Sequence, residues 1–157
     1  MTGSWLPEGF EHPARLDLPT GHHLPPIRED DVAIDFPAVM GSRLRLWDLY
    51  GQAWGWPPET MTVEQDREDL VRHAEEMTSG QSFNYAIFDA DEHELLGCVY
   101  IDPRAQPGAT GATVSWLVVD HAVGSQLEAA LAEHVPRWLS QAWPFPEVWY
   151  GIESPAW

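Results

Sequence analysis

The chain has 157 residues, and a hydrophobic fraction of 44% suits one folded domain with a substantial core. With 25 acidic and 8 basic residues the net charge at pH 7 is -17, which disfavours binding to nucleic acid or to an anionic membrane and favours a cationic partner or an amine. A single cysteine, Cys98, and the lack of an apolar run long enough to cross a membrane favour a cytoplasmic protein without disulfides.

The first 25 residues are rich in Pro, His and Trp and show no periodicity. Residues 1–25 are therefore interpreted as an arm that packs on the rest of the protein. A short strand is expected near Leu24–Ile27, where the arm ends. Residues 26–157 are then expected to form a single domain.

A helix is predicted to begin at Arg28, with Asp30 or Asp31 as its N-cap. Pro37 removes a backbone donor and is expected to interrupt the helix, and a second segment then runs to Gly51. Four apolar residues at helical spacing are expected to share the buried face of this region: Phe36, Met40, Leu44 and Trp47.

A loop heavy in Trp, Gly and Pro follows, with the sequence GQAWGWPPET from Gly51 to Thr60. The next four residues, TVEQ from Thr62 to Gln65, form a capping box that predicts the start of a helix. This helix is expected to run to about Thr78, with Gly80 as its stop. Its apolar stripe consists of Leu70, Val71, Ala74 and Met77.

Three strand-like runs come next. Phe83–Ala90 and Glu94–Asp102 are joined by a polar turn and predict an antiparallel hairpin, and Ala112–Asp120 predicts a third strand. A helical pattern starts at about Val123, directly after a turn of small residues. Pro136 lies inside that pattern, where it predicts a kink or a restart.

A last strand is predicted over Glu147–Ile152. A helix that connects the third strand of the hairpin region to this last strand makes the pair parallel, with a right-handed crossover. The other strand pairs can be antiparallel. The element order therefore predicts a mixed α/β sandwich.

This order, together with the segments LLGCVYIDP, VSWLVVD and AVGSQLEAAL, resembles the GNAT superfamily of acyl-CoA N-acyltransferases over residues 26–154. The resemblance implies an α/β (α+β) fold with a mixed, mostly antiparallel sheet, helices on both faces and a splayed central parallel strand pair. It also implies a short member with a degenerate motif, because the helix and strands that usually follow in the family are lacking.

In the GNAT family a bulged strand holds the pantetheine arm of acetyl-CoA or another acyl-CoA, and a loop of pattern Q/R-x-x-G-x-G/A holds its pyrophosphate through backbone N–H groups. The leading Q/R falls here on Val119 or, in a shifted register, on His121, and no Lys or Arg lies between Arg104 and Arg137. The resemblance assigns acyl-CoA binding to Trp116, Leu117, Val118, Val119, Ala122, Val123, Gly124, Ser125 and Gln126.

Acyl transfer to an amine needs a base for the amine proton and a donor for the oxyanion. Asp102, His121 and Ser115 are the candidate catalytic side chains, and Ser115 and Tyr100 are candidate proton donors to the thiol. A backbone N–H of Leu117 or Val118 is the candidate oxyanion donor. Asp102 also fits an ordinary turn residue before a proline, and His121 also fits a solvated capping residue.

Trp54 and Trp56, together with Tyr100, are candidate residues for binding the acceptor, because aromatic rings beside acidic groups can hold an ammonium. The alternative is that these Trp residues only fill the core beside the helices. The seven His residues show no ligand spacing with Cys or Asp, so no metal site is predicted.

The expected function is acyl-CoA-dependent N-acylation of a small amine. The alternative is an inactive GNAT-like binding or regulatory module that contacts a partner through its Trp-rich loop. A homodimer through the exposed last strand is a further expectation. A slot between Val114–Val119 and Glu147–Ile152 separates the two functions, according to whether it is open or filled by Trp116 and Trp149.

Overall fold

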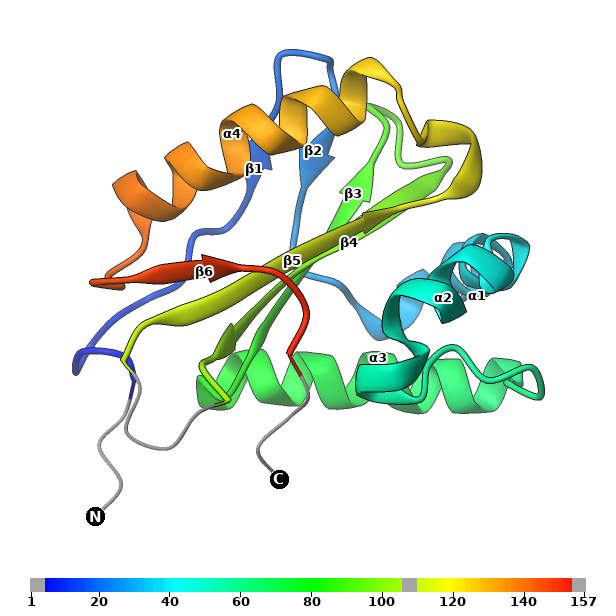
Figure 1. Ribbon diagram of the computed structural model, residues 1–157, viewed down its shortest axis with the longest axis horizontal. Coiled ribbons are helices and arrows are strands. Elements are labelled where there is room, and N and C mark those ends of the chain that lie inside the picture. Colours follow the sequence, from blue (N-terminus) through cyan, green and yellow to red (C-terminus); the bar gives the residue numbers. More distant parts are fainter. Residues whose placement is uncertain (1–4, 106–109, 154–157) are drawn as a thin grey trace.

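The computed structural model describes residues 5–105 and 110–153. Six strands form one sheet in which their order along the chain is also their order in space (Figure 1). The strands are β1 (Leu16–Asp17), β2 (His23–Leu24), β3 (Phe83–Phe88), β4 (Leu95–Pro103), β5 (Ala112–Val118) and β6 (Val148–Tyr150). The helices are α1 (Val32–Gly41), α2 (Arg43–Trp54), α3 (Val63–Ser79) and α4 (Gln126–Ala142).

Helices cover both faces of the sheet, with α4 on one side and α1, α2 and α3 on the other (Figure 1). All strand pairs are antiparallel except β5 and β6, which are parallel. The mixed sandwich and the parallel last pair predicted from the element order are therefore confirmed. Within the described residues, that parallel pair lies at the end of the sheet and not at its centre.

Side-chain alternation along β4 and β5 divides the core into two clusters. Val99 and Ile101 of β4 pack with the apolar face of α4, whereas Cys98 and Tyr100 pack with the layer formed by α1, α2 and α3. The β4–β5 ladder runs from Gly97↔Val118 to Pro103↔Ala112 without a register shift. The strand bulge that the family resemblance implied at this ladder is therefore not present.

Gly97 marks a close approach of the two central strands. A Cβ atom at this position would lie 2.0 Å from the carbonyl oxygen of Leu117, which is backbone and cannot move aside cheaply. The glycine noted in the sequence of β4 is therefore required by the packing of β5 against β4.

The strands β5 and β6 pair only over Ala112↔Val148, Thr113↔Trp149 and Val114↔Tyr150. β5 continues to Val118, whereas β6 ends at Tyr150, so the edge of β5 beyond Val114 has no strand beside it. Trp149 and Tyr150 are partly exposed at the edge of the described sheet. A homodimer through this strand stays a prediction.

The two prolines do not break their helices as expected. Pro37 lies inside α1 and Pro136 lies inside α4, and both helices continue past them. Each proline deprives a carbonyl four residues earlier of its donor, on Ala33 and on Ala132. Both alanines are exposed, so water can satisfy these carbonyls and the helices tolerate the loss.

The break between the first two helices falls instead at Ser42, and this shifts the buried face. Leu44 is 76% exposed and Trp47 is 40% exposed, so their prediction as core residues was wrong. Leu46 and Tyr50 are buried in their place, because α2 starts with its own helical phase after the break. α2 also runs past Gly51 and ends at Trp54.

Other local predictions are confirmed. The capping box of Thr62 and Gln65 opens α3, and Gly80 closes it in the left-handed conformation. The N-terminal arm packs on the core through Trp5, Leu6 and Phe10, but it also supplies β1 and β2 to the sheet. The predicted boundaries at residues 1–25 and 26–157 include residues 1–4, 106–109 and 154–157, which lie outside the described residues.

Among the described residues, no helix is long and apolar enough to cross a membrane.

Candidate functional site

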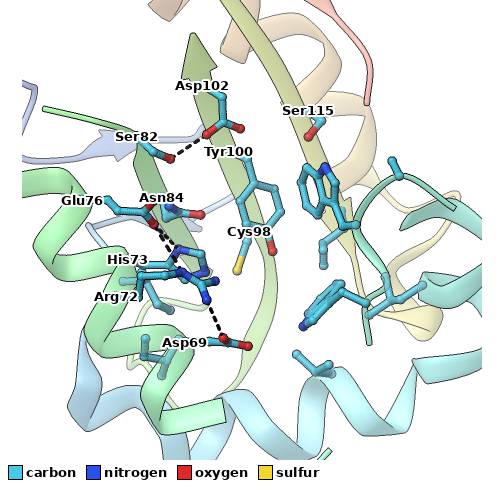
Figure 2. Close-up of a pocket in the computed structure, with 18 of the residues that line it drawn as sticks. Asp69, Arg72, His73, Glu76, Ser82, Asn84, Cys98, Tyr100, Asp102 and Ser115 are labelled. Atoms are coloured by element: carbon cyan, nitrogen blue, oxygen red, sulfur yellow. Dashed lines mark hydrogen bonds and ion pairs between the residues drawn. The ribbon is translucent and has the colours of Figure 1, made fainter. Parts of the chain in front are cut away.

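A cavity of about 730 Å³ lies between the sheet and the helical layer of α1, α2 and α3. Its floor consists of alternate residues of three strands, which are Asn84 of β3, Cys98, Tyr100 and Asp102 of β4, and Thr113, Ser115 and Leu117 of β5. Figure 2 shows Asn84, Cys98, Tyr100, Asp102 and Ser115 among these side chains, with α3 beside the cavity. Gly151 and Glu153 also line it, so the cavity reaches the region where β5 loses its neighbour.

Asp102 is a partly buried carboxyl group on the cavity floor. Its Oδ1 accepts a hydrogen bond of 2.6 Å from the Ser82 hydroxyl (Figure 2). Burial raises the pKa of Asp102 to about 6, and the nearby Glu76 carboxylate adds to this, while the hydrogen bond from Ser82 and the charge of His73 act against it. A carboxyl group with this pKa can exchange a proton near neutral pH.

Ser115 and Tyr100 are directly opposite each other on β5 and β4. Both are buried and line the same cavity, next to Asp102 on the same face of β4. Burial is also the main cause that raises the pKa of Tyr100, so its phenol stays protonated and can donate a hydrogen bond. Three of the residues singled out from the sequence are thus brought together.

A wall of aromatic rings closes the cavity beside Tyr100. The ring of Trp54 lies edge-on to Tyr100 at a centroid distance of 5.2 Å and stacks on Tyr50 at 4.5 Å. Trp56 contacts Tyr50 at 5.9 Å and also lines the cavity. Trp54 belongs to the last turn of α2 and not to a loop as predicted, and its indole N–H donates to the Glu153 carbonyl over 2.8 Å.

His121 lies apart from this group. Its side chain is 65% exposed, and its ring forms an ion pair with Glu94 outside the cavity. The structure therefore brings Asp102 and Ser115 together but does not bring His121 to them.

The free edge of β5 is formed by Trp116 and Val118. Gly151 donates to the Val114 carbonyl, while the Val119 N–H donates to Leu96 of β4. Because backbone groups alternate along a strand, those of residues 114, 116 and 118 face the open side, and those of Leu117 face β4. The N–H of Val118, and not that of Leu117, is thus available as an oxyanion donor.

Trp116 and Trp149, the two residues that could fill the slot, pack against other partners. The ring of Trp116 is edge-on to Tyr150 at 6.1 Å on the α4 side of the sheet. Trp149 packs instead against the Arg104 guanidinium, 5.3 Å from the ring centroid. Residues 114–119 and 147–152 therefore pair at one end only, and an open slot between them stays a prediction.

The turn after β5 leads into the start of α4, and the Glu128 carboxylate of the protein itself lies at this helix start. Residues 120–122 form a 3₁₀ turn, Gly124 has a φ of 75°, and Ser125 is the N-cap of α4. The Ser125 hydroxyl accepts from the Glu128 N–H, and the Glu128 carboxylate accepts the Gly124 N–H over 2.9 Å. Ala122 is buried, whereas Val123 and Gln126 are exposed.

A cation that sequence spacing does not reveal lies beside this turn. The Arg45 side chain of α2 donates to Asp120 over 2.7 Å and to the Val118 carbonyl. The Ser42 hydroxyl accepts the Asp120 N–H over 2.8 Å, so the break between α1 and α2 is tied to the end of β5. Arg45 compensates for the lack of a basic residue in the local sequence.

Sequence reasoning missed the polar side chains that the helices contribute to the cavity. They are Asp35 of α1 and Asp66, Asp69, Arg72, His73 and Glu76 of α3, together with Asn84 of β3. Asp66, His73 and Glu76 follow the same helical spacing as the core residues Leu70 and Met77. Polar residues on an apolar stripe were the available signal. No group of three or more potential ligands in the described residues could hold a metal ion.

The sequence matches no protein-family model and no curated protein. Solved structures match the fold. A ribosomal-protein-S5-alanine acetyltransferase from Vibrio fischeri matches with TM-score 0.58 and 17% identity, over 85% of this chain and 67% of that chain. RimL, a ribosomal L7/L12 alpha-N-protein acetyltransferase in complex with coenzyme A, matches with TM-score 0.63 and 17% identity, over 79% and 67%. The chain therefore has the fold of GNAT acetyltransferases.

The raised pKa of Asp102 predicts a pH-dependent effect of the substitution Asp102→Asn on stability. A carboxyl group with a pKa of about 6 in the folded protein and 3.8 when exposed stabilises the fold at low pH and loses that contribution as pH rises through 6. The Asn side chain of the variant does not titrate, so this fall in stability with rising pH is absent from the variant. Its free energy of unfolding should therefore gain on that of the wild type by about 2 kcal/mol between pH 4 and 7.

Urea denaturation at pH 4, 5, 6 and 7 measures this difference. The exposed acid Asp48 on α2 provides the matched control, since Asp48→Asn should shift stability equally at every pH. A difference between wild type and Asp102→Asn that stays constant over this range contradicts the assignment.

Proposed function

We propose that the protein is an N-acyltransferase that moves the acyl group of an acyl-CoA to the primary amine of a small molecule. The observation that carries this proposal is a single cavity lined by Ser115 and Leu117 of β5 and by the Asp102 carboxyl group, whose pKa is raised to about 6, on the fold of GNAT acetyltransferases. The titles of solved structures with this fold name protein substrates and coenzyme A, and these apply to those proteins.

The pantetheine arm pairs with the free edge of β5 in this proposal. An extended amide chain can add to such an edge through strand-like hydrogen bonds. Trp116 offers both an N–H and a carbonyl there, and Val118 offers an N–H. The Val118 carbonyl is held by Arg45, so the pairing is limited to these groups.

The reaction joins the amine nitrogen to the thioester carbon, and the carbon–sulfur bond breaks. The nitrogen loses a proton as it attacks, and the Asp102 carboxylate accepts it directly or through a water. The leaving CoA thiolate takes a proton from the Tyr100 phenol or the Ser115 hydroxyl, and that oxygen is reprotonated by the proton that Asp102 accepted from the amine, so one proton passes in total from nitrogen to sulfur.

The acceptor amine meets an acidic and aromatic surface. Trp54 and Trp56 line the cavity on the side opposite α3, and an ammonium can lie against their faces. Seven carboxyl groups among the described lining residues attract it: Asp35, Asp66, Glu68, Asp69, Glu76, Asp102 and Glu153.

The pyrophosphate of CoA approaches the turn before α4. Gly124 has open space around its Cα, and the N–H groups of the first helical turn point outward. The Glu128 carboxylate holds one of these N–H groups in the unliganded protein, so a phosphate has to displace it. Arg45 lies close enough to Asp120 at this turn to exchange its carboxylate partner for a phosphate.

Calorimetric titration with acetyl-CoA tests the proposed pyrophosphate site at the turn before α4. We expect micromolar binding by the wild type, tighter binding by Glu128→Gln because a competing negative charge is removed, and loss of binding by Gly124→Glu. The substitution Glu133→Gln, also on α4 but exposed, serves as the control and should leave affinity unchanged. Equal affinities for all four proteins, or no binding by the folded wild type at millimolar concentration, favour the alternative of a non-catalytic module.

Release of CoA thiol from acetyl-CoA in the presence of primary amines tests the base. We expect Asp102→Asn to lower kcat/KM by about 10² to 10⁴, the usual contribution of a positioned base. The wild-type rate should rise with pH as Asp102 deprotonates, with a midpoint at about 6. His121→Gln is the control, and a loss of activity equal to that of Asp102→Asn would show that the base is misassigned.

A further inference from the structure

The cavity holds a second acidic pocket at the end of α3 that is remote from Asp102. Asp35 of α1 and Asp66 of α3 are 4% and 2% exposed, and both line the cavity. Their carboxyl groups share a hydrogen bond, and burial together with the adjacent Asp66 raises the pKa of Asp35. No ion pair within residues 5–105 and 110–153 reaches either group. Two buried acids without a cation destabilise the folded protein, so this pocket lowers the stability of the fold.

Unpaired acceptors point into this cavity. Oδ2 of Asp66 is buried and has no hydrogen-bond partner, and the same holds for Oδ1 of Asn84. Both residues are 2% exposed and both line the cavity. Buried acceptors are normally paired, and an oxygen without a donor calls for an N–H or an O–H from a ligand. The proposed reaction at Asp102 does not use Asp66.

The two acidic pockets are joined by one face of α3. Asp66, Asp69, His73 and Glu76 recur at spacings of three or four residues and lie on the cavity side. Figure 2 shows Asp69 and Glu76 on this helix, with the Glu76 end close to Asp102. The eleven residues from Asp66 to Glu76 span about 15 Å of helix. A ligand in contact with both ends must be long and carry positive charge at more than one point.

The protein's own Arg72 already shows how a cation lies on this track. Its guanidinium donates to Asp69 over 3.0 Å and lies 3.7 Å from Glu76, so one side chain bridges two acids (Figure 2). The side chain is 58% exposed and can turn outward when a ligand takes its place. Asp66 lies beyond its reach in these ion pairs and stays unpaired.

We propose that the acceptor is a linear polyamine that lies along α3. One terminal amino group is at Asp102 and Glu76, where acyl transfer takes place, and the inner and distal ammonium groups lie against Asp69 and the pair of Asp35 and Asp66. This inference rests on the proposed function, of which it names the substrate class. The Trp54 and Tyr100 rings cover the methylene segments and offer cation–π contacts.

Calorimetric titration without acyl-CoA tests the second pocket independently of catalysis. Spermine is the long polyamine probe, and butylamine is the probe with a single amino group. We expect spermine to bind the wild type at least about tenfold more tightly than butylamine, and Asp66→Asn to weaken spermine binding by about tenfold with little effect on butylamine. Asp48→Asn removes one exposed charge from α2 and should leave both affinities unchanged.

Asp35→Asn is the second variant, in case Asp66→Asn does not fold, and it should weaken spermine binding in the same way. Equal weakening by Asp48→Asn and Asp66→Asn would show attraction by net charge alone and overturn the proposal, as would equal affinity for spermine and butylamine.

Acyl transfer measured with the same two amines separates the two failures. Turnover of butylamine without preference for spermine would support the N-acyltransferase proposal and contradict the polyamine proposal. Spermine binding that depends on Asp66, without any CoA release, leaves a polyamine-binding protein and removes the enzyme.

Discussion

The unbroken register between β4 and β5 is the constraint on which the rest of the structure depends. It places Tyr100, Asp102 and Ser115 on the cavity face and sends the residues between them into the core under α4. A slip of one residue would exchange these two sets, and the site would be lost. Gly97 helps to hold this register, because only a glycine allows the Leu117 carbonyl to approach so closely. The arrangement of side chains on the cavity floor is thus fixed by backbone packing.

Burial of acids is the second theme of the molecule. Of the 25 acidic residues, Asp35 and Asp66 are buried in the cavity wall, and Asp102 is partly buried on the cavity floor. Removing these groups from water raises the pKa of each. Ionisable groups whose pKa is shifted by burial are found at functional sites more often than elsewhere. The negative charge that composition alone associates with cationic partners is therefore concentrated where an amine can reach it.

The sequence was sufficient for β3, β4, β5 and β6 and for most helix ends, because these depend on local signals, but it did not predict β1. The alternating run of β4, the capping box of Thr62 and the glycine after α3 each gave the correct element. Prediction from the sequence failed where the local structure depends on residues that are distant along the chain. Pro37 and Pro136 predicted breaks, but solvent satisfies the carbonyls they leave unpaired. Leu44 was assigned to the core, but the break at Ser42 shifts the helical phase.

The site was predicted in part for the same reason. Asp102 and Ser115 could be found because they lie on strands next to a recognisable turn. The α3 acids were missed, because their place on the apolar stripe of the helix was the only sequence signal, and the packing of α3 on the sheet is what brings them to the cavity. Arg45 lies 75 positions from Asp120, and only the fold brings the two into contact.

A crystal structure of the protein with bound CoA is the most direct test of the account. We expect the pantetheine arm to pair with the backbone of Trp116 and Val118, the sulfur to lie beside Ser115 and Tyr100, and the pyrophosphate to replace the Glu128 carboxylate at Gly124. CoA bound on another surface, with the edge of β5 still empty and Glu128 in place, would contradict the proposed acyl transfer and leave the cavity as a binding site alone.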